Sequence, residues 1–401
     1  MRVVVKYGGS SVATTDKIRG IADYIIKLKK EKYNEIVVVA SAMGKMTDEL
    51  IKKANEFTDK PSTRELDSLL STGEQQTVAL LSIALQSKGQ DAVSLTGAQV
   101  KIETTGIHTK SKIKNICVDR IEKHLSEGKI VLVAGFQGIN ENGDITTLGR
   151  GGSDTTAVGL AAQLKCECKI YTDVDGIYNI DPRVYADAKP LKYISYEEMM
   201  EMAHLGAGVM EPRAVEIGQK YSVPIFVGRS LSDEGGTYIM EKSYGLEDKL
   251  ITGISVIREI LVATISNIEY SSEKTAEIFS IAEKYGLNVN MIIQNINNDK
   301  KLEISFSVPF NEKNLLDHTL EEVKNNYPNV EVKIDDNLGM ISVVGVGMAN
   351  NSGVAGKFFS TLSNANINFY QVTTSEISIS CSVEKKDINK AVEVTAKEFS
   401  I

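Results

Sequence analysis

Two short glycine-rich segments carry residues suited to holding an anion. The first, KYGGSS at residues 6–11, follows an apolar run and joins Lys6 to Gly8, Gly9 and Ser10. Glycine lacks a Cβ, so backbone N–H groups can approach a phosphate closely, and the N-terminus of a following helix adds to the attraction. The segment matches neither the P-loop nor the dinucleotide-binding pattern. An anion site with Lys6 as a mobile charge is one interpretation, and a structural turn is the other.

The second segment, TLGRGGSDTT at residues 147–156, runs into an apolar stretch typical of a helix. Arg150 can hold a carboxylate through two parallel hydrogen bonds. Asp154 lies among anion-binding groups, where it either caps the helix or takes part in catalysis. Two separate glycine-rich loops, each with its own cation, favour phosphoryl transfer over simple anion binding.

Acidic residues mark two further segments. YTDVDGIY at residues 171–178 leaves a buried apolar run at its carboxyl end, where ligands bind in open α/β sheets. Its acids lack the glycine and glutamate spacing of a calcium-binding EF-hand loop. STGE at residues 71–74 is predicted to begin a helix, so Glu74 is either a partner of the helix dipole or a ligand-binding group.

The elements that would position these segments alternate between strand and helix over the first 230 residues. Continuous apolar runs indicate buried strands, and helical patterns cover about residues 17–30, 75–87 and 116–125. This alternation is typical of a mostly parallel sheet between two layers of helices. Residues 139–148, with Asn142 followed by Gly143, predict a hairpin instead. The predicted strands lie at residues 3–5, 36–39, 92–95, 130–133, 169–171 and 224–227.

The chain changes character beyond about residue 230, where a glycine pair and a charged stretch predict a linker. A pattern of apolar residues and asparagine then recurs 80 residues further along: Phe279, Leu287 and Asn288 return as Phe359, Ile367 and Asn368. Two such copies predict two small ferredoxin-like modules, with an unrelated α+β tail as the alternative. The predicted divisions are a first domain at 1–230, a linker at 231–250 and modules at 251–335 and 336–401, with the strand near 251–259 assigned to either module.

Composition excludes several classes of protein. The 401 residues carry a formal net charge of −8, and an acidic chain without a large basic block is a poor nucleic-acid binder. No apolar run reaches the roughly 18 residues of a membrane span, and the chain enters a predicted strand at once rather than a signal peptide. The four cysteines, Cys117, Cys166, Cys168 and Cys381, are too scattered for a disulfide framework or a zinc site. We therefore expect a cytoplasmic protein with no nucleic-acid or membrane partner.

In their order along the chain, KYGGSS, SAMGKMTDEL (41–50), STGE, GRGGSDTTA (149–157) and YTDVDGIYNIDPR (171–183) resemble the aspartate kinase family. The resemblance covers the whole chain, and NIN (366–368) with TSEI (374–377) resembles the tandem ACT domains of that family. It implies an α/β fold, the amino-acid kinase (carbamate kinase-like) αβα sandwich with a mostly parallel sheet, followed by two ferredoxin-like ACT modules (α+β). No GxGxxG segment follows, so we expect the monofunctional form rather than the fusion with homoserine dehydrogenase.

The resemblance also implies an activity and residue roles. ATP, carrying Mg²⁺, would phosphorylate the side-chain carboxylate of L-aspartate, with no protein ligand assigned to the metal. Lys6 and Asp154 would be catalytic. Aspartate would be bound by Thr47, Glu74, Arg150 and Ser153, and the nucleotide by Lys6, Gly8, Gly9, Ser10, Thr172, Asp173, Tyr178 and Arg183.

One position departs from the family. Many relatives have a phosphate-facing lysine where this chain has Gly208. Either Arg183, Arg213 or a magnesium ion takes over that charge, or the nucleotide binds with a slightly different geometry.

The ACT modules imply feedback regulation by a free amino acid, lysine or threonine, in a chain that is at least a dimer. Effectors of such modules lie at the seam between paired modules. The expected lining is Asn290 and Gln294 in the first module, and Asn366, Asn368, Phe369 and Ser375 in the second. The asparagines alternatively only terminate helices and turns. An amino-acid sensor without catalysis and a kinase of another small carboxylate stay open as rival functions.

Overall fold

The structure is a computed structural model of the chain, and it describes residues 1–232, 234–241, 250–297, 300–348, 351 and 353–401. These residues divide into two compact units. The first comprises Met1–Tyr178, Pro190–His204 and Gly208–Gly245, and the second comprises Asn179–Lys189, Leu205–Ala207 and Leu246–Ile401. Within the described residues, no helix has the length and apolar composition needed to cross a membrane.

An eight-stranded sheet forms the centre of the first unit. All of its neighbouring strands run parallel except β11 and β12, which are antiparallel. The strands are, in spatial order, β10 (Tyr193–Ile194), β12 (Thr237–Ile239), β11 (Ile225–Arg229), β9 (Glu167–Thr172), β1 (Arg2–Tyr7), β2 (Glu35–Ala40), β6 (Ile130–Ala134) and β3 (Ala92–Leu95). The mostly parallel sheet predicted from the apolar runs is thus confirmed.

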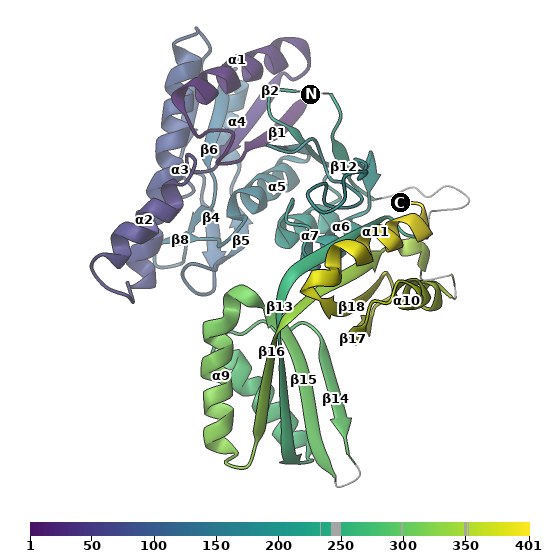
Figure 1. Cartoon of the computed structure of the whole chain (residues 1–401). Helices are drawn as coiled ribbons and strands as arrows, with labels where there is room; N and C mark the ends of the chain where they lie inside the picture. Colours follow the sequence, from purple (N-terminus) through teal and green to yellow (C-terminus); the bar gives the residue numbers. More distant parts are fainter. Residues whose placement is uncertain (233, 242–249, 298–299, 349–350, 352) are drawn as a thin grey trace. The chain divides into compact units, whose positions relative to one another are not determined.

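Helices cover both faces of this sheet (Figure 1). They are α1 (Thr15–Glu31), α2 (Met46–Asn55), α3 (Thr63–Gln86), α4 (Asp119–Ser126), α5 (Gly152–Leu164), α6 (Tyr196–His204) and α7 (Pro212–Lys220). Side chains alternate across a strand, so Val3 and Val5 of β1 face one side and join a core with buried residues of α1 and α3. Helix α5 is buried along most of its length, as expected of a helix that is apolar on all sides.

A second, four-stranded sheet extends the first unit beside α3 and α5. Its order is β5 (Lys112–Ile116), β4 (Ile102–Thr105), β7 (Gln137–Ile139) and β8 (Ile145–Thr147). Strands β7 and β8 form the hairpin predicted at residues 139–148. The helix predicted at 116–125 is shifted, because residues 112–116 form β5 and α4 begins only at Asp119.

The described residues of the second unit form an antiparallel sheet of six strands with four helices. The strand order is β14 (Ile292–Ile296), β15 (Lys301–Pro309), β13 (Gly253–Glu269), β16 (Glu331–Val344), β18 (Ser378–Glu384) and β17 (Phe369–Thr374). The helices are α8 (Ser272–Lys284), α9 (Lys313–Asn326), α10 (Val354–Asn364) and α11 (Ile388–Phe399), with short 3₁₀ turns at Phe310–Glu312, Val346–Met348 and Lys385–Asp387.

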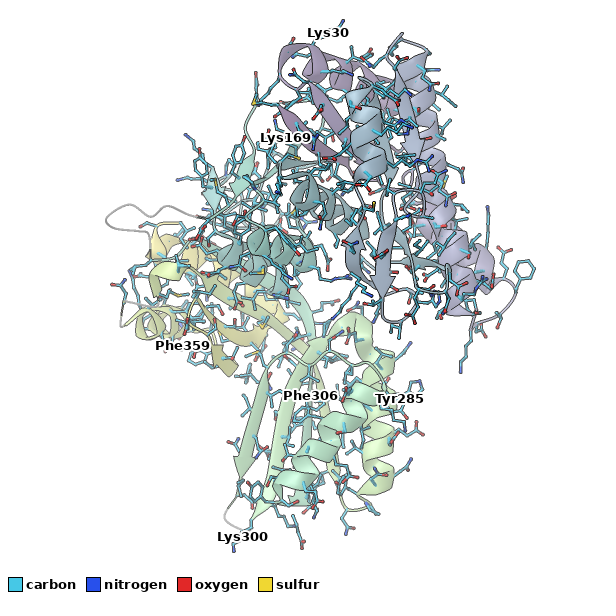
Figure 2. All side chains as sticks on the ribbon, turned by 180° about the vertical axis from the view of Figure 1, so that it is seen from behind. Lys30, Lys169, Tyr285, Lys300, Phe306 and Phe359 are labelled. Carbon is cyan, nitrogen blue, oxygen red and sulfur yellow. The ribbon has the colours of Figure 1, made fainter. Side chains whose placement is uncertain are left out.

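Two long strands, β13 and β16, run through both halves of this sheet. The first residues of β13 pair with residues 340–344 of β16, whereas its later residues pair with β15 and with residues 331–335 of β16. Each half has its own apolar core under its helices. Figure 2 shows Phe306 and Tyr285 in one half and Phe359 in the other. The two modules therefore share their central strands, and β16 crosses the division predicted between residues 335 and 336.

The predicted linker at 231–250 is not entirely a linker. Residues 237–239 form β12, which pairs with β11 and β10 in the main sheet of the first unit. The short sequence TYI lacks the apolar run that marks the other strands, so the sequence offers little sign of it. The linker residues 233 and 242–249 lie outside the described residues.

Candidate active site

Parallel pairing brings the glycine-rich and acidic segments to one edge of the main sheet. Lys6 near the end of β1 lies opposite Val39 of β2 and Ile170 of β9 in the strand register. The segments that follow these three strands, beginning with Gly8, Ser41 and Asp173, therefore leave the sheet side by side at its carboxyl edge. Figure 1 shows α5, into which the second glycine-rich segment runs, against β1.

The first glycine-rich turn is held by its neighbours on both sides. The Gly8 N–H donates to the Tyr171 carbonyl at 3.3 Å, and the Gly44 N–H donates to the Gly9 carbonyl at 3.0 Å. A Cβ at Gly9 would lie 2.9 Å from the carbonyl oxygen of Ala42, closer than real Cβ contacts allow. Gly9 is therefore required by the close approach of the chain after β2, and Ser10 is exposed beyond it.

Lys6 and Asp154 form a buried ion pair. The distance from Lys6 Nζ to Asp154 Oδ1 is 2.5 Å, and the two residues are only 8% and 9% exposed. Asp154 Oδ1 has an ion-pair distance to the ammonium without the angle of a hydrogen bond, and it has no hydrogen-bond partner among the described residues. Because two charges are buried only when they are paired, Lys6 is held at the mouth of the glycine turn with its ammonium directed at the start of α5.

The start of α5 is shaped by glycines. Gly151 takes a left-handed conformation with φ of 64°, and its carbonyl accepts the N–H groups of Asp154 and Thr155. Ser153 is buried against Gly135, where an added Cβ would lie 2.8 Å from the Ser153 hydroxyl oxygen. Asp154 therefore lies in the first turn of the helix, and its carboxylate pairs with Lys6.

Glu74 is buried inside α3 and not at its start. Helix α3 begins at Thr63, so the prediction that STGE begins a helix is wrong, and Glu74 is not a partner of that helix's N-terminal dipole. The residue is 3% exposed. Its Oε1 accepts the Ala42 N–H at 3.1 Å, and its Oε2 has no hydrogen-bond partner in the described part of the chain. Burial raises the pKa of Glu74 to about 7, against the lowering effect of backbone N–H groups. A ligand cation would satisfy Oε2.

Thr47 and Arg150 are predicted to bind aspartate together with Glu74, and they differ in exposure. Thr47 lies half-buried in the first turn of α2. Arg150 is exposed in the turn before α5, and within the described parts of the chain its guanidinium has no hydrogen bond or ion pair. Its donors are therefore available to an incoming carboxylate.

The predicted nucleotide residues do not all belong to one unit. Thr172 ends β9, and its carbonyl accepts both the N–H and the hydroxyl of Ser230, which also bonds to Ser11. Asp173 follows as an exposed residue that accepts from the Thr172 hydroxyl. Tyr178 lies at an isolated bridge with Pro190.

Arg183 belongs to the second unit, where its guanidinium forms an ion pair with Asp181 at 2.7 Å. The guanidinium of Arg213 donates to the carbonyls of Leu148 and Ser111 at 2.8 and 3.0 Å. Arg213 thus holds the backbone before Arg150 in place.

Glu211 is a residue of this region that sequence reasoning missed. Its side chain packs against Gly151, where an added Cβ would lie 2.5 Å from the Glu211 Cβ. Burial raises the pKa of the Glu211 carboxyl; Arg213, Arg150 and His204 act in the opposite direction, and Asp154 adds to the rise. No local pattern marks it, because only the fold brings residue 211 to the start of α5.

The described residues contain no group of three or more His, Cys, Asp or Glu side chains arranged to hold a metal ion. Cys168 and Cys381 are buried, and Cys166 is partly buried. Burial raises the pKa of all three thiols. Their thiols are therefore protonated at neutral pH and unsuited to nucleophilic chemistry.

The predicted effector residues lie at the two outer strands of the six-stranded sheet. Gln294 is exposed on β14, and its amide oxygen accepts from the Thr275 hydroxyl at 3.1 Å, while Asn290 is exposed just before that strand. Asn368, Phe369 and Ser375 lie at the ends of β17 on the opposite edge.

Two of these residues also have local structural roles. Asn366 has φ of 54° directly after α10, the conformation in which asparagine often ends a helix. The Ser375 hydroxyl accepts the N–H groups of Ile377 and Ser378 within a turn. For these two positions the alternative of a turn-forming role has direct support.

Comparison with known proteins agrees with this architecture. Residues 1–229 match the model of the amino acid kinase family, and residues 341–399 match an ACT domain. The chain is 44% identical to the aspartokinase of Geobacillus stearothermophilus over 400 residues, covering all of this chain and 97% of the relative. It is 45% identical to aspartokinase 2 of Bacillus subtilis, covering all of this chain and 98% of the relative. The chain belongs to the aspartate kinase family.

Solved structures support the same assignment of fold. The structure of Escherichia coli aspartokinase III in complex with aspartate and ADP matches with a TM-score of 0.82 and 23% identity, covering 100% of both chains. The aspartate kinase of Synechocystis matches with a TM-score of 0.56 and 37% identity, covering 100% of this chain and 69% of that one. The predicted family, the α/β fold with its ACT region and the assignment as a kinase enzyme are confirmed.

Proposed function

We propose that this aspartate kinase transfers the γ-phosphoryl group of ATP to the side-chain carboxylate of L-aspartate, giving ADP and 4-phospho-L-aspartate. The buried ion pair of Lys6 and Asp154 carries the proposal, because it fixes a cation between the glycine turn and the helix start that two separate motifs predict as anion sites. Full-length relatives named aspartokinase at 44–45% identity support the choice of acceptor.

Aspartate is bound through both of its α-substituents. Arg150, exposed and without a partner in the described chain, takes the α-carboxylate through its two parallel donors. Glu74 takes the ammonium with its unpartnered Oε2. Thr47 and Ser153 supply hydroxyl groups to the same ligand. Each end of the substrate thus meets a group whose charge or unfilled oxygen it would satisfy.

The nucleotide is bound at the carboxyl edge of the main sheet. The backbone of Gly8, Gly9 and Ser10 holds the terminal phosphates, since the Cβ atoms that would block them are absent at the two glycines. The base and ribose lie toward Thr172, Asp173 and Tyr178, and Arg183 is the remaining residue proposed to bind the nucleotide. The ADP complex of E. coli aspartokinase III supports nucleotide use in this fold.

Mg²⁺ accompanies the nucleotide and, when bound, neutralises part of the phosphate charge. Such ions are usually held by phosphates together with one or two carboxylates, which agrees with a site that has few acids in reach. Carboxylates at this edge include Asp154, which is already paired with Lys6, the exposed Asp173, and Glu211 at the start of α5.

Charge explains what these residues do during the transfer. The acceptor carboxylate is ionised at neutral pH, so the reaction requires no strong general base. The barrier comes from bringing an anion in line with a polyanionic phosphate. Lys6 reduces that repulsion from a fixed position, and Asp154 keeps the ammonium from turning away. Catalysis is then mainly positioning and charge neutralisation.

For the second unit we propose a regulatory role. Lysine or threonine binds between ACT modules of two chains, in contact with Asn290, Gln294, Asn366, Asn368, Phe369 and Ser375, and the chain is at least a dimer. A lysine and aspartate complex of E. coli aspartokinase III is known in the same fold, which supports lysine as an effector class. Binding regulates only if the effector favours one arrangement of the protein over another.

The test is direct chemical detection of the acyl phosphate. Purified protein is incubated with ATP, Mg²⁺ and a panel of amino acids and dicarboxylates, and hydroxylamine traps any acyl phosphate while ADP release is followed in parallel. We expect trapped product and equal ADP release with L-aspartate, and loss of both in Lys6→Ala. ADP release without trapped product, or a faster reaction with another acceptor, contradicts the proposal.

A further inference from the structure

A fully buried carboxylate, Asp67, lies near the start of α3 and outside every motif used so far. It is 0% exposed, and three hydrogen-bonding groups surround its carboxylate. Its Oδ1 accepts the Thr147 hydroxyl at 2.5 Å, its Oδ2 lies 2.7 Å from Nδ1 of His108, and both oxygens are 3.1 Å from the Thr109 N–H. A buried charge with this many partners is held in one orientation.

The donors come from two loops that are distant in sequence. Thr147 is the last residue of β8 and stands three residues before Arg150. Thr109 has φ of 69°, a conformation that is costly for a β-branched residue and that the bond to Asp67 helps to hold. The Ser111 N–H donates to the Thr147 carbonyl at 3.0 Å, so the two loops are also joined to each other.

The guanidinium of Arg213 also joins these two segments. The Arg213 guanidinium bonds to the carbonyls of Leu148 and Ser111, one from each loop. The backbone that carries Arg150 is therefore tied to α3 through Asp67 and to α7 through Arg213. Arg150 itself has no partner in the described chain, so its position depends on this backbone.

Helix α3 carries Glu74 as well as Asp67. Seven residues separate them, two turns or about 10 Å along the axis, and both are buried. One rigid helix thus bears the proposed ammonium-binding group and the anchor of the loop that bears the proposed carboxylate-binding group.

We propose that Asp67, with His108 and Thr147, is the positioning cluster that sets the distance between Arg150 and Glu74 and so selects an acceptor with both an α-carboxylate and an α-ammonium group. The inference rests on the proposed function, since it assumes that these two residues bind aspartate. The cluster does not touch the substrate; it acts through the backbone of residues 147–150.

Two neighbouring threonines provide a matched test. Thr147 and Thr146 are both buried, on opposite faces of β8, and the Thr146 hydroxyl bonds to Thr104 at 2.6 Å instead of to Asp67. Replacement by valine removes one buried hydroxyl bond in each case with little change of shape. In Thr147→Val we expect the aspartate KM to rise at least about fivefold, within the scale of losing one hydrogen bond to a charged group, with the ATP KM changed less than about twofold. Thr146→Val should leave both constants within about twofold of the wild type.

β-Alanine provides a second readout, because it is aspartate without the α-carboxylate and makes no use of Arg150. Its inhibition constant against aspartate should stay within about twofold in Thr147→Val while the aspartate KM rises. A loss of folded protein lowers the apparent kcat but leaves the aspartate KM and the β-alanine inhibition constant unchanged. It therefore cannot produce a rise in the aspartate KM alone. Parallel rises for aspartate and β-alanine, or equal effects of the two threonine variants, overturn the inference.

His108→Ala keeps the inference testable if the buried variants do not fold. The His108 side chain is 20% exposed on a loop, so its truncation costs little packing. We expect a rise in the aspartate KM without one in the ATP KM, and an unchanged aspartate KM overturns the positioning role. Absence of trapped acyl phosphate in the wild type refutes the proposed function itself, whereas a normal wild type with unaffected variants refutes only the cluster.

Discussion

Replacing Glu74 by glutamine tests two statements at once: that Glu74 binds the substrate ammonium, and that burial raises the pKa of its carboxyl group. Glutamine keeps the size of the side chain and an acceptor for the Ala42 N–H, and it removes the charge. Burial raises the pKa of Glu74 from 4.5 to about 7, so the folded chain holds a proton there that the unfolded chain releases. A difference of that size corresponds to roughly 3 kcal/mol.

The sign of the stability effect follows from proton binding. Between about pH 4.5 and 7 the folded state binds more protons at Glu74 than the unfolded state, so stability falls as pH rises through that window and levels off above pH 7. Glutamine does not titrate, so the Glu74→Gln variant does not lose stability in this way as the pH rises. The stability of the variant relative to the wild type should therefore increase by roughly 2–3 kcal/mol between pH 5 and 8, as measured from the difference in Tm at each pH.

Binding has the opposite dependence, because the substrate ammonium needs the ionised carboxylate. At pH 6 only about a tenth of Glu74 is ionised if its pKa is about 7, so the apparent aspartate KM should be about tenfold above its value at high pH. In Glu74→Gln the KM should be raised roughly 10²-fold, the scale of breaking a buried ion pair, and should lose this pH dependence.

Initial rates of ADP release at saturating ATP, from pH 6 to 8.5, give both profiles. Glu198→Gln is the control, because Glu198 is a buried carboxylate bonded to Ser195 at the start of α6. Parallel KM profiles for the wild type and Glu74→Gln would refute the assignment of the ammonium to Glu74. Parallel Tm profiles would show that its carboxylate is not protonated by burial.

Three further outcomes are expected. Arg150→Lys loses the two-pronged geometry and should raise the aspartate KM roughly 10²-fold with little change in the ATP KM; an unchanged aspartate KM removes Arg150 from the substrate site. Lys6→Ala should lower kcat by about 10²–10³ and weaken nucleotide binding, measured by calorimetry, far less; near-normal turnover contradicts its role. Gln294→Ala should relieve inhibition by lysine or threonine at unchanged uninhibited kcat, whereas Asn295→Ala, on the other face of β14, should leave inhibition intact.

The sequence predicted the local structure well where a local pattern reflects a local structural need. Gly9 is an example, since the turn requires the absence of a Cβ and glycine is the residue that provides it. The strands were predicted equally well, because a strand buried on both faces is an uninterrupted apolar run. Both signals can be read without knowing what lies elsewhere in the chain.

The prediction failed where a tertiary contact sets the residue. STGE has the composition of a helix start, so the helix was expected to begin there. In the fold, Gly73 lies inside α3. The residue is glycine because an added Cβ would lie 2.8 Å from the Ala42 Cβ, and the same close approach lets Glu74 reach the Ala42 N–H. Asp67 and Glu211 were missed for a related reason, since their partners lie 40 or more residues away along the chain.

The effector residues lead to a conclusion about assembly. Gln294 lies on β14 and Ser375 beside β17, which are the two outer strands of the six-stranded sheet. Five strand spacings separate these edges, about 24 Å, whereas a free amino acid is several times shorter. A single chain therefore cannot bring both residues to one ligand. If they line one site, β14 of one chain lies beside β17 of a second chain, and each such pair of chains offers two equivalent sites. Inhibition should then weaken on dilution to concentrations at which sedimentation shows single chains, and full inhibition of a single chain would separate the two sets of residues into different sites.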